Sequence, residues 1–462
     1  MKHLYTKYKP HYRDNLSLAV PVMISQLGHM LVQVSDSAIV GHWAGTVPLA
    51  AVALANGVFF IILVTGLGIS YGITPLIAQE NSRENFGECG RLLINSLLIN
   101  VVTGVLLFLL VYLGSAYMLG HLGQSPLVVA QAKLFLPLLA ISIVPLMVFN
   151  TFKQFAEGLG FTKQAMSISI WGNILNICLG ITFVKGLFGI LPMGIRGVGY
   201  STLIDRCVMA VVMTLYVLRS ERFRKYLHNF AIKNIDRLRS WNLLKIGAPV
   251  AMQYTFEVSA FAGANFIIGT IGPEPQAAHQ IALTLASCTY MMSSGVSAAA
   301  AIKSGNHFGI KNFKLLRTSA ISSYHIVLVL MCITALMFTF CNHLLPYIFT
   351  TDKAVLAIAA QLLILAAFFQ LFDGTQVVGL GVLRGMGDVQ VPTFITFLAY
   401  WVVGIPVGYW FGIHEQLGAV GVWYGLVLGL VVASVLLFFR FHVLSLRNSP
   451  EDRKSESPEV IV

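Results

Sequence analysis

Three acidic residues, Asp36, Glu257 and Asp373, lie near the middle of long apolar runs, in a chain that otherwise keeps most of its charges between such runs. A carboxylate in the middle of a membrane span costs on the order of 3 kcal/mol by insertion scales, so it is usually kept for an ion or proton step. A buried carboxylate without a fixed cation can exchange a proton, or it can bind Na⁺ together with carbonyl and amide oxygens. The three residues are therefore candidate sites for a coupling cation or a cationic substrate, and each could hold Na⁺.

Polar residues recur with helical spacing around each carboxylate. In the first apolar run these residues follow one another at steps of three, four and three: Gln26, His29, Gln33 and Asp36. Such steps place side chains on one face of a helix. A polar face is costly in lipid, so we expect it to line a water-filled cavity or to contact other helices. Two later runs repeat the pattern: Gln253 with Glu257, and Gln370 with Asp373 and Gln376.

None of the three carboxylates has Lys or Arg within one helical turn of its own run, so each is expected to be available to a mobile cation. The alternative is that each carboxylate only links helices through hydrogen bonds, a role commoner for Asn or Gln in spans. Asn173 and Asn176 could supply oxygens or link helices in this way. Asp205 and Arg206 are adjacent and point in different directions on a helix, so we expect a structural role for them rather than a mutual ion pair. His279, near an outer helix end, fits either role.

The composition indicates a polytopic helical membrane protein. Of the 462 residues, 56% are hydrophobic and only 11% are charged. About 20 apolar residues are needed for a helix to cross a bilayer. The sequence predicts an all-α integral membrane protein whose twelve transmembrane helices cover residues 15–41, 49–79, 92–114, 127–152, 160–184, 195–218, 243–271, 276–302, 318–341, 354–383, 389–411 and 417–440.

The distribution of basic residues explains the formal charge of +11. If the N-terminus is cytoplasmic, most of the 30 Lys and Arg residues fall on the cytoplasmic side of the predicted spans. This pattern follows the positive-inside rule. It predicts a multi-pass protein of the plasma (inner) membrane with both termini in the cytoplasm, and it implies no nucleic-acid partner.

The chain repeats itself about a central polar segment. PVMISQ from Pro21 recurs as PVAMQY from Pro249, at an offset of 228 residues (249 minus 21). Six spans per copy return the chain to its starting side, so the copies are parallel repeats, which commonly enclose a central cavity with alternating access. The predicted parts are a cytoplasmic N-terminal segment (1–14), an N-lobe (15–218), a cytoplasmic linker (219–242), a C-lobe (243–441) and a cytoplasmic tail (442–462).

The carboxylates are not duplicated between the two repeats. At the offset of 228 Asp36 lies opposite Ala264 and Glu257 opposite His29, and at the offset of 227 that holds later in the chain, where EGLG from Glu157 recurs as RGMG from Arg384, Asp373 lies opposite Leu146. The lobes are therefore expected to share an architecture and to differ in chemistry, with one acid in the first lobe and two in the second.

The sequence does not indicate an enzyme. It contains no HExxH or GxxxxGK[ST] motif, and no paired CxxC. Without a nucleotide-binding loop ATP is not the direct driver, so we expect a secondary transporter with no cofactor, driven by an H⁺ or Na⁺ gradient. A lipid-linked saccharide or headgroup flippase of related two-lobe architecture is the alternative. Such a protein would be expected to line its cavity with several Arg or Lys for phosphate, whereas Arg206 is the one basic residue near the middle of a predicted span.

From about Asn15 to Phe441 the chain resembles the MATE (multidrug and toxic compound extrusion) family, in its NorM-like branch. The resemblance rests on the order and spacing of PVMISQLGHMLVQVSDSAIVGHWAG, EGLGFTKQ, APVAMQYTFEVSAF, AAHQIAL and FQLFDGTQVVGLGVLRGMGDVQVPTF. It implies antiport, in which cationic amphipathic drugs and dyes are exported in exchange for H⁺ or Na⁺. It also implies two six-helix lobes that form a V around the cavity, and we expect the monomer to function.

The resemblance also assigns roles to single residues. Asp36 matches the first-lobe acid, Glu257 the seventh-span acid and Asp373 the tenth-span acid, all implicated in cation coupling or substrate release. Two positions depart from the pattern: Gly180 stands where relatives often carry Asn or Asp, and Phe369 stands where sodium-coupled relatives can carry Tyr. Weaker cavity candidates are Gln33, His29, Asn176, Gln253, Tyr254, Phe369 and Gln280.

Overall fold

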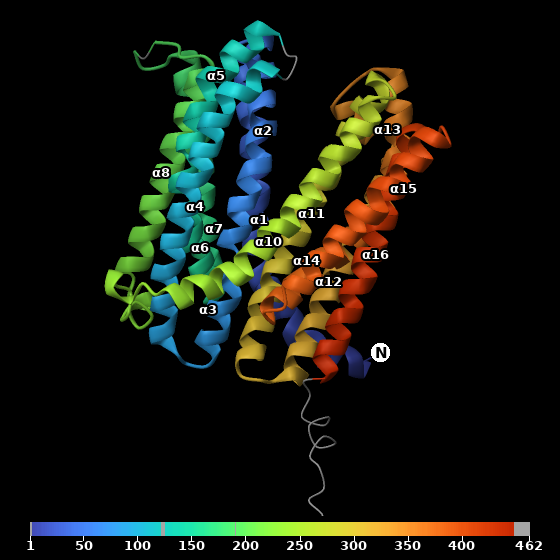
Figure 1. Cartoon of the computed structure of the whole chain (residues 1–462). Coiled ribbons are helices and arrows are strands. Elements are labelled where there is room, and N and C mark those ends of the chain that lie inside the picture. The colour runs from blue at the N-terminus through green and yellow to red at the C-terminus, as the bar shows by residue number, and fades with distance from the viewer. Residues whose placement is uncertain (1, 122–124, 190, 448–462) are drawn as a thin grey trace, which may run out of the picture. The chain divides into compact units, whose positions relative to one another are not determined.

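All the regular structure in the described residues is helical. The computed structural model describes residues 2–121, 125–189 and 191–447, and these ranges contain no strand (Figure 1). From residue 448 onward the predicted cytoplasmic tail lies outside the described residues. The helical architecture confirms the predicted all-α fold class.

The first part of the chain forms a series of helices joined by short turns. They are α1 (Lys2–Trp43), α2 (Thr46–Ser70), α3 (Ile73–Ser82), α4 (Phe86–His121), α5 (Pro126–Ile141), α6 (Ile143–Gly158), α7 (Thr162–Lys185) and α8 (Ile195–Arg219). The second part contains α10 (Arg237–Gly269), α11 (Pro273–Gly309), α12 (Phe313–Phe340), α13 (Lys353–Gly385), α14 (Gln390–Phe397), α15 (Ile405–Tyr409) and α16 (Gly418–Arg447). Shorter elements are α9 (Glu221–Arg224), η1 (Ile232–Asn234), η2 (Leu345–Ile348), η3 (Leu398–Gly404) and η4 (Trp410–His414).

Eleven helical segments of the described chain are long and apolar enough to cross a membrane. They overlap every predicted span except residues 243–271, which lie within α10. At 33 residues α10 is long enough to cross, but Gln253, Glu257 and Asn265 make its sequence less apolar. The polar residues that point to a function in this helix therefore also weaken its hydropathy signal.

Two predicted spans are interrupted. The span predicted over 49–79 consists of α2 and α3, which are separated at Tyr71 and Gly72. A side-chain carbon at Gly72 would lie 2.8 Å from the Cα of Gly247, so the break lies where two backbones meet. The span predicted over 127–152 consists of α5, which ends at Ile141, and α6, which begins at Ile143. Neither break could be predicted from the sequence, because the apolar run continues through both positions.

The eleventh predicted span, 389–411, is an α-helix interrupted by two π-helical stretches, η3 and η4. Helix α16 packs closely against this region, because a side-chain carbon at Gly425 would collide with the backbone of Gly404 and Gly408. π-helical turns are rare in proteins, and those that occur often lie at functional sites. This stretch carries Tyr400 into the buried interior of its unit.

The chain forms two compact units. We call residues 24–255 the N unit and residues 1–23 with 256–462 the C unit. Helices α1 and α10 are each divided between the two units, and each contains an internal proline, Pro21 and Pro249 respectively. The lobes drawn from the repeat, 15–218 and 243–441, stay a prediction, because compactness divides the chain inside α1 and α10 rather than at the linker.

Each unit has its own hydrophobic core. In the N unit, helices α2 and α4 to α8 pack around buried phenylalanines, among them Phe135, Phe149 and Phe155. In the C unit, α13 packs against α11, α12 and α16, and Trp423 and Tyr400 are fully buried. The cores hold the polar residues of each unit on fixed helices.

Candidate functional site

The C unit contains a pair of buried carboxylates. Glu257 on α10 is 5% exposed and Asp373 on α13 is 2% exposed. The two groups are close enough to repel each other electrostatically. Two buried like charges are costly unless a proton or a cation shares their site. The structure thus brings together the two acids that the sequence placed in the second lobe, and the pair can hold a cation or a proton.

Tyr400 joins this acidic pair from the π-helical segment η3. Its hydroxyl donates a hydrogen bond to Gln376 Oε1 at 3.0 Å. Both Glu257 and Asp373 lie within electrostatic range of the Tyr400 hydroxyl. Sequence reasoning missed Tyr400, because an aromatic residue in an apolar span carries no signal of its own and the π turns are set by packing against α16.

Tyr400 connects the acidic pair to three further aromatic side chains. The ring of Phe261 lies 5.8 Å from that of Tyr400 and 5.9 Å from that of Phe369, and Phe369 lies 5.4 Å from Trp423. We call these four residues the aromatic cluster. Aromatic faces attract cations, more strongly where water is excluded. The cluster includes Phe369, one of the predicted cavity candidates, and its members Tyr400 and Trp423 are fully buried.

Helix α13 presents buried polar atoms that have no hydrogen-bond partner among the described residues. They belong to Gln370 (both side-chain polar atoms), Asp373 (Oδ1) and Gln376 (Nε2). The spacing of three residues places them on one face of α13. Buried polar groups in proteins are normally satisfied, so unpaired ones need an explanation such as water or a ligand. This face can therefore bind a cation or its water.

The N unit contains a second polar cluster, formed where α1, α7 and α8 meet. Asp36 is 8% exposed, and its Oδ1, like Asn176 Oδ1 and Asp205 Oδ1, has no hydrogen-bond partner in the described part of the chain. Asn176 donates to Thr202 Oγ1 at 3.4 Å. The predicted candidate Asn176 thus lies on α7, which approaches α1 where Asn173 meets Gly28.

Arg206 changes the electrostatics expected for Asp36. The expectation that Asp36 has no fixed cation nearby is wrong, because Arg206 and Asp205 of α8 lie within its electrostatic range. Sequence distance along α1 could not reveal a neighbour that α8 supplies. The Arg206 guanidinium donates to Ser142 Oγ at 2.6 Å and lies 5.3 Å from the centre of the Phe59 ring. This N-unit cluster therefore carries one guanidinium for two carboxylates, and in the C unit Arg384 likewise lies within electrostatic range of Glu257.

Gly180 lies at the contact between α1 and α7. A side-chain carbon there would lie 3.3 Å from Ile39 Cδ1 and 3.5 Å from Ser201 Oγ. A larger side chain at this position would require Ile39 to shift slightly, whereas the distance to Ser201 is an ordinary van der Waals contact. Because glycine has no side chain, residue 180 itself supplies no oxygen ligand to the N unit.

The remaining candidates lie in different environments. His29 is half-buried, and Lys153 and Arg206 are within its electrostatic range. Gln253 is buried, whereas Gln33 and Gln280 are exposed. Tyr254 packs in the N unit with its ring 5.7 Å from that of Tyr71. Next to Gln280, His279 is fully buried and accepts a hydrogen bond from Trp423 Nε1 at 3.0 Å, which favours a structural role for this histidine.

The described residues contain no group of three or more His, Cys, Asp or Glu placed to hold a metal ion together. A Na⁺ ion at either cluster would therefore need amide, hydroxyl or carbonyl oxygens in addition to carboxylates, as is usual for hard cations.

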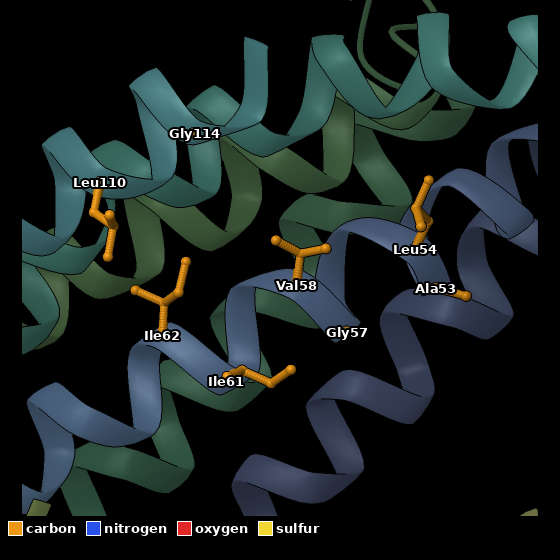
Figure 2. Close-up of a pocket in the computed structure, with 8 residues that line it drawn as sticks. All are labelled: Ala53, Leu54, Gly57, Val58, Ile61, Ile62, Leu110 and Gly114. Carbon is orange, nitrogen blue, oxygen red and sulfur yellow. The ribbon is translucent and has the colours of Figure 1, made fainter. Parts of the chain in front are cut away.

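An apolar groove of about 630 Å³ lies in the N unit between α2 and α4 (Figure 2). Its lining consists of aliphatic side chains and glycines: Ala53, Leu54, Gly57, Val58, Ile61, Ile62, Leu110 and Gly114. No charged or amide side chain faces it that could orient a cation. It is not part of either carboxylate cluster.

Replacement of Tyr400 by Phe tests whether its hydroxyl contributes to the site. The variant removes the donor to Gln376 and the hydroxyl dipole near both acids. The hydrogen bond that holds Gln376 in place contributes about 1 kcal/mol. A cation bound beside Gln376 in the variant would have to supply up to that energy to order the amide, so we expect binding of a fluorescent organic cation to the purified protein to weaken by up to roughly fivefold. Tyr409→Phe is the control, because Tyr409 is 55% exposed. Equal binding by both variants would remove Tyr400 from the site.

Comparisons with known proteins agree with these observations. A family model described as MatE matches residues 21–182 and again 249–410, at an offset of 228 residues (249 minus 21), which is the predicted repeat. "Probable multidrug resistance protein NorM" from Agrobacterium fabrum is 30% identical over 439 residues, 94% of each chain. "Multidrug resistance protein MdtK" from Yersinia enterocolitica is 31% identical over 448 residues, 95% of this chain and 96% of its own. The crystal structure of the eukaryotic MATE transporter AtDTX14 has the same fold, with a TM-score of 0.87 at 19% identity, covering 96% of this chain and 99% of that one.

Proposed function

Because this chain belongs to the MATE family, in its NorM-like branch, we propose that it exports cationic amphipathic drugs and dyes in exchange for H⁺ or Na⁺. Its relatives are named as multidrug resistance proteins, and like them it is a multi-pass membrane protein. Export takes place by alternating access across the plasma (inner) membrane, with both termini in the cytoplasm and the monomer as the functional unit.

The observation that carries this proposal is the acidic pair of Glu257 and Asp373 beside Tyr400 and the aromatic cluster. An organic cation bound there gains from the carboxylate charge and from the aromatic faces. A proton or Na⁺ that reaches the same carboxylates removes that charge, and the organic cation then binds less tightly. Competition for one pair of carboxylates thus couples the inward movement of the ion to the outward movement of the drug.

The membrane potential favours this exchange when more positive charge enters than leaves. Each net elementary charge that moves inward gains about 2.3 kcal/mol per 100 mV, so two coupling ions per monovalent organic cation would gain that amount. A one-for-one exchange is electroneutral and is driven by the concentration gradient of the ion alone. Both clusters have an arginine within electrostatic range, Arg206 for Asp36 and Asp205, and Arg384 for Glu257. The C-unit acids differ because they also lie in range of Tyr400, which belongs to the aromatic cluster. We therefore place primary coupling and substrate binding in the C unit.

Separate imposed gradients test the proposal. Purified protein is reconstituted into proteoliposomes, and efflux of a fluorescent organic cation is followed under a pH gradient at equal Na⁺, or under a Na⁺ gradient at equal pH. We expect one gradient to drive transport and the other to have little effect if coupling is exclusive. The same vesicles without protein give the passive leak. A protein that folds and reconstitutes but responds to neither gradient is not a cation-coupled exporter.

A further inference from the structure

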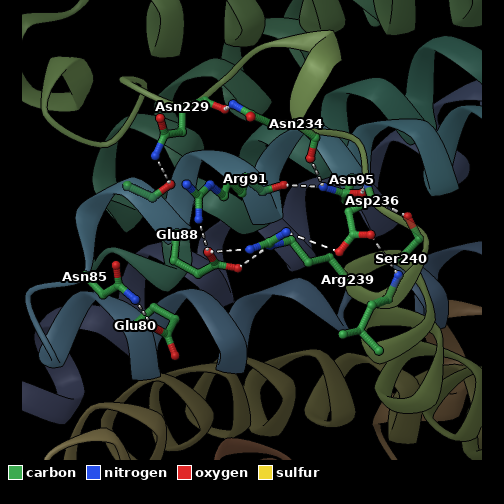
Figure 3. A network of polar contacts seen from close by, with 12 residues as sticks. Glu80, Asn85, Glu88, Arg91, Asn95, Asn229, Asn234, Asp236, Arg239 and Ser240 are labelled. Atoms are coloured by element: carbon green, nitrogen blue, oxygen red, sulfur yellow. Dashed lines mark hydrogen bonds and ion pairs between the residues drawn. The ribbon is translucent and has the colours of Figure 1, made fainter.

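The segment that connects the two repeats is folded against α4 of the N unit (Figure 3). Arg239 donates to Glu88 at 2.6 Å and 3.2 Å, and it also contacts Asp236 at 3.2 Å. Arg91 reaches the same Glu88 carboxylate at 3.3 Å. The segment between α8 and α10 is therefore held in place by a set of ion pairs rather than serving as a loose linker.

Asn95 of α4 fixes the start of α10 more closely. Its side-chain carbonyl accepts hydrogen bonds from the backbone of Asp236 at 2.8 Å and from Ser240 Oγ at 3.0 Å. Its amide donates to the carbonyl of Asn234 at 3.1 Å. The inward side of residues 232–241 is thus polar and hydrogen-bonded to α4, as Figure 3 shows.

The outward side of the same segment is apolar. Every third residue is an exposed hydrophobic side chain: Ile232 (80%), Ile235 (37%), Leu238 (65%) and Trp241 (56%). A soluble surface helix would place such residues toward its core and polar residues outward. Here the arrangement is reversed, because the polar side of the segment faces α4 and the apolar side chains face outward. We call these four residues the outward stripe.

Basic side chains flank the outward stripe. Lys233, Arg237 and Lys245 are exposed beside it, and Arg222 and Arg224 are exposed earlier in the segment. Helix α10 continues from the stripe into the span predicted from residue 243, so the stripe lies where a membrane surface meets the protein. Indole rings favour this interface, since one part of the ring is apolar and its N–H needs a polar partner.

We propose that the outward stripe and its flanking basic residues form a binding surface for anionic phospholipids of the cytoplasmic leaflet. The apolar side chains insert at the border between acyl chains and headgroups, while Lys233, Arg237 and Lys245 meet the phosphates. Basic residues at a membrane surface are attracted by anionic headgroups, and salt weakens this attraction. A zwitterionic phospholipid would also bind the apolar stripe, but its cationic headgroup cancels the charge of its phosphate, so the basic residues would meet no net negative charge.

Quenching of Trp241 fluorescence by brominated lipid tests this assignment on the full-length protein. The protein is placed in nanodiscs in which either phosphatidylglycerol or phosphatidylcholine carries the bromine. The signal of Trp241 is the difference between the native chain, which has six Trp, and Trp241→Phe. We expect at least about twofold more quenching of Trp241 by brominated phosphatidylglycerol, and we expect the excess to shrink as salt is raised.

Two further variants make the test specific. The double variant Lys233→Gln, Arg237→Gln should lose the preference for phosphatidylglycerol while Trp241 remains quenched by both lipids. Trp171, which is 69% exposed on α7, supplies the matched control, and Trp171→Phe should remove quenching that is equal in both lipids and insensitive to salt. Equal quenching of Trp241 by the two lipids would overturn the proposal. So would protection of Trp241 from both lipids, the result expected if a second copy of the chain covered the stripe.

Discussion

Replacing Glu257 with Gln, or Asp373 with Asn, is expected to lower efflux of an organic cation by at least about tenfold. Each variant keeps the size of the side chain and removes its negative charge. Truncating one partner of a buried charged contact costs about 2 to 5 kcal/mol, and 1.4 kcal/mol corresponds to a factor of ten. The coupling ion loses the same carboxylate, so both binding and exchange should suffer. Initial efflux rates in proteoliposomes measure the effect.

Glu274→Gln provides a matched control for these variants. Glu274 is an exposed acid in the first turn of α11, outside both carboxylate clusters. We expect this variant to transport at the rate of the native chain. Native rates for both Glu257→Gln and Asp373→Asn would show that the acidic pair has no role in coupling, even if the chain transports dyes. Asp36 would then be the remaining candidate for the coupling site.

We expect Asp36→Asn to affect efflux differently from Glu257→Gln and Asp373→Asn. Since Arg206 lies within electrostatic range of Asp36 and Asp205, neutralising Asp36 leaves one carboxylate and one guanidinium in this cluster. The carboxylate neutralised in Asp36→Asn is not one of the two, Glu257 and Asp373, that lie near Tyr400 of the aromatic cluster. Comparing the three acids under each imposed gradient thus separates the contributions of the two units.

The helices and the acids could be predicted from the sequence because both depend on local chemistry. A span needs only enough consecutive apolar residues, and Asp36, Glu257 and Asp373 stand out because they interrupt such runs. The repeat was visible because the two copies keep similar residues at a nearly constant offset, and the MatE model matches both. These features require no knowledge of which helices touch.

The partners of the acids could not be predicted in this way. Arg206 reaches Asp36 from α8, and Tyr400 reaches the acidic pair from a π-helical stretch. Both depend on how helices pack: α7 and α8 meet closely, and Gly425 of α16 approaches the backbone around Gly404. Helical spacing describes one helix at a time, so it finds stripes but not the neighbours that complete a site.

A buried ion pair in the N unit leads to the largest expected effect on stability. Lys153 and Glu157 lie one turn apart on α6 with Nζ and Oε1 3.9 Å apart, and their side chains are only 5% and 4% exposed. Lys153 also donates to Ser25 Oγ of α1 at 3.2 Å. Removing one member of a buried pair leaves the other charge uncompensated, which costs about 3 to 5 kcal/mol. We therefore expect Lys153→Met to lower the thermal unfolding midpoint of the detergent-solubilised protein markedly.

The double variant Lys153→Met, Glu157→Gln distinguishes a charge effect from a packing effect. It removes both charges, so most of the lost stability should return, because replacing a whole buried pair is often nearly neutral. Lys163→Met is the control, since Lys163 is exposed on α7 and such substitutions usually change stability by no more than about 0.5 kcal/mol. If the double variant were as unstable as Lys153→Met, the loss would come from the contact between Lys153 and α1. The ion pair would then have no part in holding α1 against α6.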